Sequence, residues 1–222
     1  MTRGQLRRAV GAGDKVERRA AIVRAAEALL HRDPAARFSV EALARRAGLA
    51  KGTVYLYFGS REEVLLALHE QQLHALFDVL EGALARPRAR ARSVVRAGLS
   101  HHAAHPEFYP LAANCRSMLD TNVRAQAALA FHVAIAKRLG AMGKRVEALY
   151  PGLKRGEGAA LLTNSYALMI GLWQQVDVPA DLREAMQRDD LRILRIDFEK
   201  QLERALLDLW EAAERRGTRG AT

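Results

Sequence analysis

The sequence predicts an all-α protein in which a small N-terminal unit of three helices precedes a larger helical region, with about nine helices in total. Apolar residues recur at positions i, i+3, i+4 and i+7 along most of the 222 residues, which is the period of an amphipathic helix. Sustained alternation of apolar and polar residues is absent, and so are the Asn-Gly and Asp-Gly turns of short hairpins.

The composition is that of a soluble globular protein with a sizeable core, because 50% of the residues are hydrophobic and 27% are charged. No apolar run approaches the ~20 residues that span a bilayer, so we expect no membrane partner. The basic N-terminus lacks the apolar stretch of a signal peptide. Cys115 is the single cysteine and cannot form an internal disulfide. Together these features predict a cytoplasmic protein.

The positive charge is concentrated near the N-terminus. The formal net charge of the chain is +10. Residues 1–60 contain 12 Lys and Arg against 5 Asp and Glu, a net of +7, whereas residues 61–222 contain 23 against 20, a net of +3. Such a local excess favours a polyanionic partner, although a merely soluble basic surface explains the charge equally well.

Local capping signals place the first two helices. Asp14 and Glu17 form a capping box that predicts the start of the first helix, and Ser39 is the expected N-cap of the second. Gly48 suits the left-handed position that follows the end of a helix. Three arginines precede the first predicted helix and are interpreted as a flexible basic arm: Arg3, Arg7 and Arg8.

The third predicted helix, residues 51–58, is too short to be stable alone, because isolated helices below ~12–15 residues are marginal in water. A second capping box, at 60–63, opens the fourth helix directly after it. Two helices joined by a short turn at Gly48 and supported by the first helix form a helix-turn-helix. Eight residues give a helix of ~12 Å, comparable with the width of the major groove of DNA.

The N-terminal turn of the third helix carries the residues expected to read DNA. Lys51 and Thr53 lie where helix-turn-helix proteins contact bases. Gly52 costs roughly 1 kcal/mol relative to alanine inside a helix, and its missing side chain would let the backbone approach a sugar-phosphate strand. The alternative is that a glycine in the first turn costs little and has no role.

Four further residues are candidates for phosphate contacts. Tyr55 and Tyr57 can pack their rings on the small unit and direct their hydroxyls to phosphate, or can be simple core residues; at least one should be exposed. Arg61 opposes the helix dipole at the start of the fourth helix, and either a nearby phosphate or the two following glutamates would offset this. Ser39 can donate to a phosphate in addition to capping its helix.

The stretch FSVEALARRAGLAKGTVYLYFGSREEVLLAL (38–68) resembles the DNA-binding module of the TetR family of transcriptional regulators. Its most specific part is Y-x-Y-F followed by S-R-E-E, although many relatives have histidine where this chain has Tyr57. The resemblance implies a sequence-specific regulator, most commonly a repressor that a small molecule releases from its double-stranded DNA operator. It also implies the following DNA-contacting positions: Ser39, Lys51, Gly52, Thr53, Tyr55, Tyr57 and Arg61.

Helical segments continue towards the C-terminus. We place a DNA-binding domain at 1–62 and a ligand-binding and dimerisation domain at 63–216, with the helix 63–84 connecting the two and residues 217–222 as a disordered tail. Pro87 and the arginines around it indicate a bend after the connecting helix. Five more helices are expected, over 89–104, 107–119, 122–149, 156–176 and 181–215.

The last two long helices carry apolar surfaces that must be buried against other parts of the protein or against a second copy. LLTNSYALMIGLWQQV (161–176) is apolar nearly all round, and the final helix carries a stripe formed by Leu191, Leu194, Phe198, Leu202, Leu206 and Leu209. Both could be ordinary core. The family resemblance implies that these helices form a four-helix bundle with a second copy, giving a homodimer that addresses two half-sites.

The same resemblance implies a cavity for a largely apolar small-molecule effector. The candidate lining residues, which could equally be core, are Phe108, Tyr109, Met118, Phe131, Tyr166, Met169 and Trp173. Candidate polar groups that would orient the effector are Asn114, Cys115, His132 and Asn164. An effector must favour the DNA-incompetent shape, because equal affinity for both shapes would shift nothing.

Motifs for catalysis, metals or cofactors are weak. HHAAH (101–105) spaces His101 and His105 as zinc ligands on a helix, but no glutamate lies between them and no third ligand is evident. Cys115 has no evident histidine partner. We therefore expect no enzyme activity, no metal and no cofactor. The alternative to a regulator is a helical small-molecule-binding protein or enzyme that binds nucleic acid nonspecifically.

Overall fold

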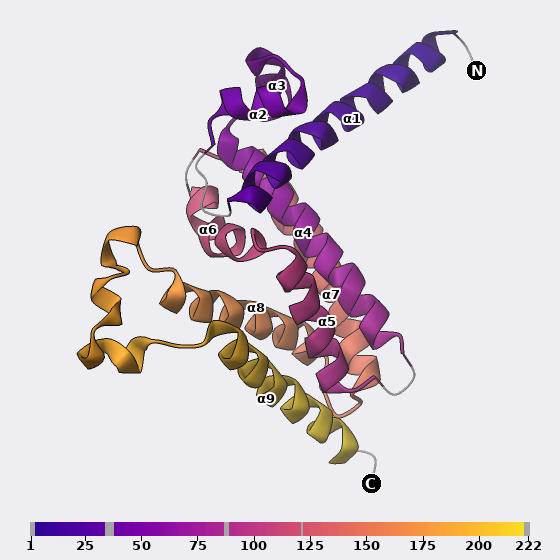
Figure 1. The fold of residues 1–222 in the computed structure, drawn as a ribbon. Helices are drawn as coiled ribbons and strands as arrows, with labels where there is room; N and C mark the ends of the chain where they lie inside the picture. The colour runs from indigo at the N-terminus through magenta and orange to yellow at the C-terminus, as the bar shows by residue number, and fades with distance from the viewer. Residues whose placement is uncertain (1–2, 34–37, 87–88, 121, 220–222) are drawn as a thin grey trace. The chain divides into compact units, whose positions relative to one another are not determined.

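The regular structure is entirely helical in the computed structural model, which describes residues 3–33, 38–86, 89–120 and 122–219 (Figure 1). The α-helices in these ranges are α1 (Arg3–Arg32), α2 (Val40–Ala47), α3 (Lys51–Tyr57), α4 (Arg61–Leu84), α5 (Ala91–Ala104), α6 (Phe108–Asp120), α7 (Ala125–Leu149), α8 (Glu157–Val176) and α9 (Phe198–Arg219). Three short 3-10 helices separate α8 from α9: η1 (Ala180–Leu182), η2 (Ala185–Gln187) and η3 (Asp189–Leu194). The predicted all-α class is confirmed.

The chain forms two compact units, each built from two segments of sequence. The first unit comprises residues 1–72 and 106–132, and the second comprises residues 73–105 and 133–222. The helices α4 and α7 therefore each contribute one part to each unit. The division at residue 62 that we expected from sequence stays a prediction.

A small apolar core holds the first three helices of the first unit together. Ile22 of α1 and Leu43 of α2 are fully buried, and Val54 of α3 is 2% exposed. The second helix packs against both α1 and α3. This is the helix-turn-helix that the sequence predicts, and it explains why the short α3 is stable, since its apolar side packs against α2, which α1 supports.

The predicted caps around α2 and α4 are present. The Oγ of Ser39 accepts a hydrogen bond from the N–H of Ala42 at 3.2 Å, and Gly48 has φ 69°, in the left-handed region. At the start of α4 the Oγ of Ser60 accepts from the N–H of Glu63 at 3.1 Å, whereas the Glu63 carboxylate accepts from the N–H of Gly59 and not of Ser60, so the predicted capping box is only half formed. Each of these caps involves residues only three or four positions apart, so the local sequence pattern was sufficient to predict them.

The start of α1 was predicted incorrectly. The helix begins at Arg3, so Arg3, Arg7 and Arg8 belong to its backbone and do not form a flexible arm. Asp14 lies inside the helix, where its carboxylate pairs with Arg18 one turn later at 3.2 Å. The residues before Asp14 mix good helix formers with Gly11 and Gly13, and the helix continues through both glycines because extending a nucleated helix costs less than starting one.

In the second unit, α9 packs against both α8 and α5, and α8 and α9 lie side by side (Figure 1). The Nε1 of Trp210 on α9 donates to the Oγ of Ser165 on α8 at 3.0 Å. The backbones of α7 and α8 approach very closely at Gly143 and Gly158, where an added Cβ on Gly158 would lie 2.1 Å from the carbonyl oxygen of Gly143. Glycine is required there because backbone atoms occupy the space of a side chain.

The final helix does not span 181–215 as predicted. Residues from Ala180 to Leu194 form 3-10 turns, and α9 begins at Phe198 because Asp197 caps it, its Oδ1 accepting from the N–H of Lys200 at 3.2 Å. Leu194 is 54% exposed, so only the part of the predicted apolar stripe from Phe198 onwards lies on the helix. The helix extends to Arg219, into the predicted tail, and residues 220–222 lie outside the described residues.

Candidate DNA-binding site

The third helix turns one side inward and presents the other to solvent. Val54 and Phe58, four residues apart, are each 2% exposed and form the inner side. Gly52, Tyr55 and Leu56 are exposed on the other side, and Lys51 is exposed at the N-terminal end of the helix. The residues with which helix-turn-helix proteins read bases are therefore accessible at the N-terminal end of this helix.

Lys51 is held by a neighbouring helix. Its ammonium donates to the carboxylate of Glu41 on α2, and this pairing raises the pKa of Lys51 and lowers that of Glu41. Both side chains are about half exposed, so the pair contributes little to stability. Glu41 was not singled out from the sequence, and the pair places the lysine head group beside the first turn of α2.

An exposed apolar side chain, Leu56, was also missed. It lies between Tyr55, which is 48% exposed, and Tyr57, which is half-buried, and is itself 82% exposed. The expectation that at least one tyrosine is exposed is confirmed. The spacing of Val54 and Phe58 could have predicted this exposure. When two residues four positions apart face the core, the residue midway between them lies on the opposite side of the helix. Apolar contacts of this kind recognise the methyl group of thymine in the major groove.

Arg61 begins α4 but is not a fully solvated charge. Its guanidinium lies over the ring of Phe38, 4.8 Å from the centroid, and the Nη1 is 3.5 Å from Glu62. The side chain is 26% exposed. Ser39 is exposed and Thr53 is half-buried, so all seven predicted contact positions lie on α3 or at the starts of α2 and α4.

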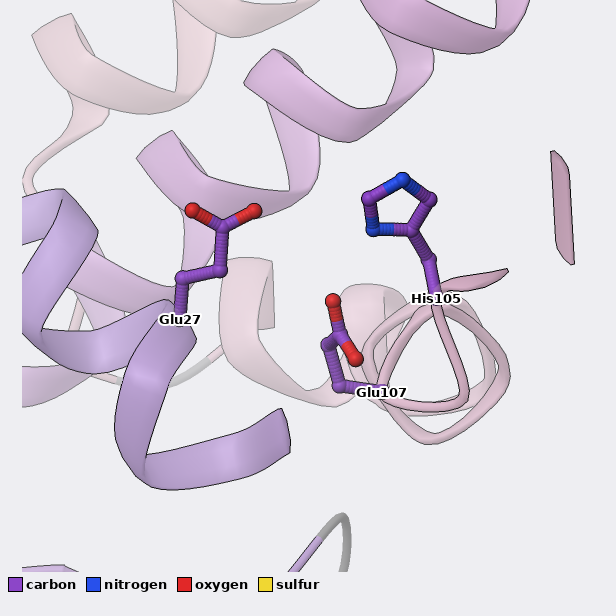
Figure 2. A group of neighbouring side chains, drawn as sticks. All are labelled: Glu27, His105 and Glu107. Carbon is purple, nitrogen blue, oxygen red and sulfur yellow. The ribbon is translucent and has the colours of Figure 1, made fainter. Parts of the chain in front are cut away.

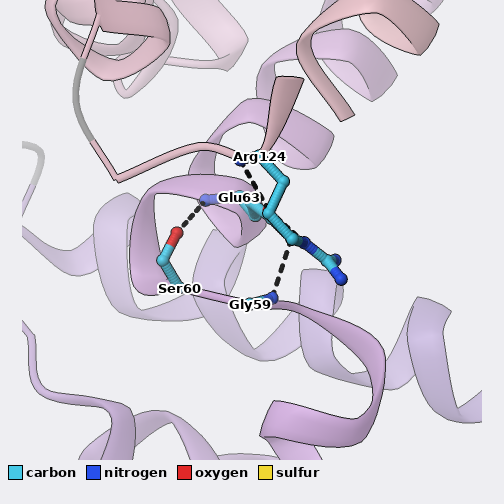
Figure 3. Close-up of polar contacts among 4 residues, drawn as sticks. All are labelled: Gly59, Ser60, Glu63 and Arg124. Carbon is cyan, nitrogen blue, oxygen red and sulfur yellow. Dashed lines mark hydrogen bonds and ion pairs between the residues drawn. The ribbon is translucent and has the colours of Figure 1, made fainter. Parts of the chain in front are cut away.

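The start of α4 also contains a strongly perturbed carboxylate. Glu63 is 4% exposed and forms an ion pair with Arg124, with Nη2 of the arginine 2.7 Å from Oε2 (Figure 3). Hydrogen bonds from the Arg124 guanidinium, and then from the backbone N–H of Gly59, lower the pKa of Glu63 to about 2, although burial opposes this. The carboxylate is therefore ionised at all physiological pH values.

The predicted effector-binding residues are divided between the two units. In the first unit, Phe108 and Phe131 flank the buried His69, with ring centroids 5.6 and 6.2 Å from that of the histidine. Met118 is buried there and Tyr109 half-buried. In the second unit Met169 is buried, and Tyr166 and Trp173 are half-buried. Their role in binding an effector stays a prediction.

One group of three possible cation ligands occurs among the described residues (Figure 2). Glu27 of α1 and Glu107 lie in the first unit with carboxylate oxygens within 4.8 Å of each other. His105 belongs to the second unit, as the last residue of its 73–105 segment. Glu107 is fully buried and accepts a hydrogen bond from Nε2 of Gln72 at 2.8 Å. We assign no metal site to this group.

Cys115 and the histidine motif show no sign of a reactive centre. Burial raises the pKa of the Cys115 thiol to about 11, which keeps it protonated and unreactive at neutral pH. Within HHAAH, the rings of His101 and His105 lie 4.6 Å apart, and the histidine between them, His102, is buried. No helix among the described residues has the length and apolar character needed to cross a membrane.

A helix-turn-helix with an outward-facing second helix defines a DNA-binding protein. The chain belongs to the TetR family: residues 22–68 match the family model described as bacterial regulatory proteins, tetR family, and residues 69–216 match the model described as tetracyclin repressor-like, C-terminal domain. It is therefore a DNA-binding transcription regulator, as the resemblance in residues 38–68 implied.

Solved structures share the fold at low sequence identity. A tetR family transcription regulator from Shewanella sp. PV-4 is 20% identical with a TM-score of 0.54, over 88% of this chain and 97% of that one. A transcriptional regulator from Streptomyces coelicolor A3(2) is 18% identical with a TM-score of 0.50, over 89% and 96% of the two chains. No curated protein matches this chain.

Gly52 offers a direct test of backbone approach to DNA. An added Cβ would meet nothing within 4 Å in the protein, so Gly52→Ala should raise the free energy of unfolding by about 0.5 kcal/mol. If α3 lies against a DNA strand at this point, the same change should lower operator affinity by about tenfold or more, equivalent to ~1.4 kcal/mol. Urea unfolding and fluorescence anisotropy with labelled DNA measure the two effects.

Gly82→Ala is the matched control, because Gly82 is also an exposed helical glycine with open space around its Cα. It should give the same gain in stability with unchanged DNA affinity. Equal DNA affinity for Gly52→Ala and wild type would show that Gly52 has no role in close approach.

Proposed function

We propose that this regulator is a sequence-specific repressor, acting in the cytoplasm as a homodimer, and that a largely apolar small molecule releases it from its operator. The exposed side of α3 carries the proposal, because Lys51, Gly52 and Tyr55 form an accessible surface on a helix about 10 Å long, which fits the major groove. The net charge of +7 on residues 1–60 supports binding to a polyanion.

A second copy is expected because one short reading helix is a small footprint. The outer side of α8 supports a dimer through α8 and α9: it exposes Ala160, Asn164, Ala167 and Gly171, small or short residues that recur every three or four positions. Small side chains on one face of a helix allow another helix to approach closely. Sedimentation equilibrium should therefore give twice the 24.6 kDa mass of one chain.

The test of sequence-specific binding is competition between DNA from upstream of the coding region and random DNA of equal length. The regulator should bind its operator about 10³-fold or more tightly than random DNA at physiological salt. A protein that binds nucleic acid only nonspecifically, which is the alternative function, would show no preference. Small molecules that displace the operator fragment would identify the effector. Such a molecule must bind more tightly to the form of the protein that cannot bind DNA.

Arg61→Gln should change the salt dependence of binding. The slope of log K against log salt falls by about 0.9 for each phosphate that the protein no longer neutralises, so a dimer with two fewer neutralised phosphates should show a slope smaller by about 1.8. Glutamine keeps a polar side chain over Phe38 and limits any effect on packing. Lys51→Ala and Thr53→Ala, as comparison variants, should instead alter sequence preference. An unchanged slope for Arg61→Gln would show that Arg61 does not contact phosphate.

A further inference from the structure

The carboxylate of Glu63 accepts hydrogen bonds from Gly59, just before α4, and from Arg124, 61 residues further along the chain than Glu63 (Figure 3). Oε1 accepts from the backbone N–H of Arg124 at 3.0 Å and from its Nε at 2.7 Å. Oε2 accepts from Nη2 of Arg124 at 2.7 Å and from the backbone N–H of Gly59 at 2.8 Å. A carboxylate can accept about four hydrogen bonds, so these four bonds occupy all the accepting positions of Glu63.

The position of Gly59 shows how closely Arg124 lies over the connection between α3 and α4. An added Cβ on Gly59 would be 2.9 Å from Nε and 3.3 Å from Cδ of Arg124, and 3.2 Å from Oε1 of Glu63. The arginine therefore occupies the space that any side chain at residue 59 would need. The connection is short, because α3 ends at Tyr57 and α4 begins at Arg61.

This short connection decides where α3 points. The third helix has seven residues and is anchored on its inner side mainly by Val54, with Phe58 just beyond its last turn. A rotation at its C-terminal end would move every exposed residue on the outer side. The Glu63 carboxylate holds Gly59 on one side of the connection, and Arg124 holds that carboxylate from a segment that precedes α7.

We propose that Arg124 is a positioning residue for DNA reading: through Glu63 it fixes the connection at Gly59 and thereby the direction in which α3 presents its outer side to the major groove. The role is distinct from a DNA contact: Nε and Nη2 of the guanidinium donate to Glu63, and the salt dependence of binding tests whether its remaining N–H groups contact phosphate. The inference rests on DNA binding through α3 and adds a residue outside the 38–68 segment to the reading apparatus.

The experiment compares operator binding by wild type with binding by Arg124→Ala, Arg124→Lys and Gly59→Ala. Arg124→Ala should weaken operator binding about tenfold, within the range produced by residues that act on a site without touching its ligand. Lysine keeps the charge but cannot donate two parallel hydrogen bonds, so Arg124→Lys should weaken binding only about threefold. Gly59→Ala should act in the same direction as Arg124→Ala, because its methyl group displaces the arginine side chain.

Two readouts separate positioning from other roles. The slope of log K against log salt should be the same for Arg124→Ala and wild type, whereas removal of a group that binds phosphate directly would lower it by about 0.9 per phosphate. Hydrogen exchange of the Gly59 amide, measured without DNA, should accelerate in Arg124→Ala because its acceptor is no longer held. Arg155→Ala is the control, since it removes an exposed positive charge from the second unit and should change neither readout.

The proposal is overturned if Arg124→Ala binds the operator like wild type, if its salt slope falls, or if operator and random DNA lose affinity equally. If Arg124→Ala does not fold, the ranking of wild type, Arg124→Lys and Gly59→Ala decides, and equal operator affinities among them would contradict positioning. A wild-type protein that shows no preference for any DNA would instead contradict the proposed function, while the exchange of Gly59 would still test the contact.

Discussion

Gly158→Ala should lower the free energy of unfolding by about 3 kcal/mol, the upper end of the usual cost of overpacking. The added methyl group would lie 2.1 Å from the carbonyl oxygen and 2.9 Å from the carbonyl carbon of Gly143, and backbone atoms cannot move aside as a flexible side chain can. The helices α7 and α8 would have to separate. Thermal unfolding followed by circular dichroism should show a Tm lower by roughly 6–12 °C.

Gly143→Ala should have a similar effect from the other helix, since its Cβ would lie 2.6 Å from the backbone nitrogen of Ala159. Gly140→Ala is the matched control on the same helix, because its Cβ would meet nothing within 4 Å. That change should raise stability by about 0.5–1 kcal/mol through helix propensity alone. If Gly158→Ala and Gly140→Ala had equal stabilities, the close approach of α7 and α8 would be wrong.

The free energy of unfolding should fall by about 3 kcal/mol between pH 7.5 and pH 5.5, about 1.4 kcal/mol for each of two buried histidines. Burial lowers the pKa of His69 to about 3. Burial also lowers the pKa of His102 to about 3, with a further contribution from the charges of His101 and His105. Both groups stay neutral in the folded protein over this pH range, whereas the unfolded chain takes up protons near pH 6.5.

The folded protein is less stable at low pH because the unfolded chain binds more protons there than the folded protein does. Because the folded pKa values lie below the unfolded value, the stabilisation is complete above about pH 6.5 and is lost as the pH falls towards 3. Urea unfolding at the two pH values measures the difference. His69→Leu and His102→Leu should each remove about half of it. A stability that does not change between the two pH values would contradict neutral burial of these histidines.

Local sequence patterns were sufficient for much of the fold. The caps at Ser39, Gly48 and Ser60 were predicted because each depends on hydrogen bonds within one turn of helix. The outward side of α3 followed from helical period together with the requirement that a short helix be covered on one side. The start of α1 was missed because Asp14 has the right type for a cap and two glycines precede it closely, yet the helix continues through Gly11 and Gly13 to Arg3.

The sequence by itself determined that this is a helical protein with a helix-turn-helix near its N-terminus, since those features depend on residue type and spacing along a few turns. Only the tertiary structure decided that Lys51 pairs with Glu41, that Arg124 reaches Glu63 and that Gly143 lies against Gly158. The physical reason is that such contacts join positions whose separation in sequence has no fixed relation to their separation in space. They depend on how the loops return each helix to the core, and no local period encodes that.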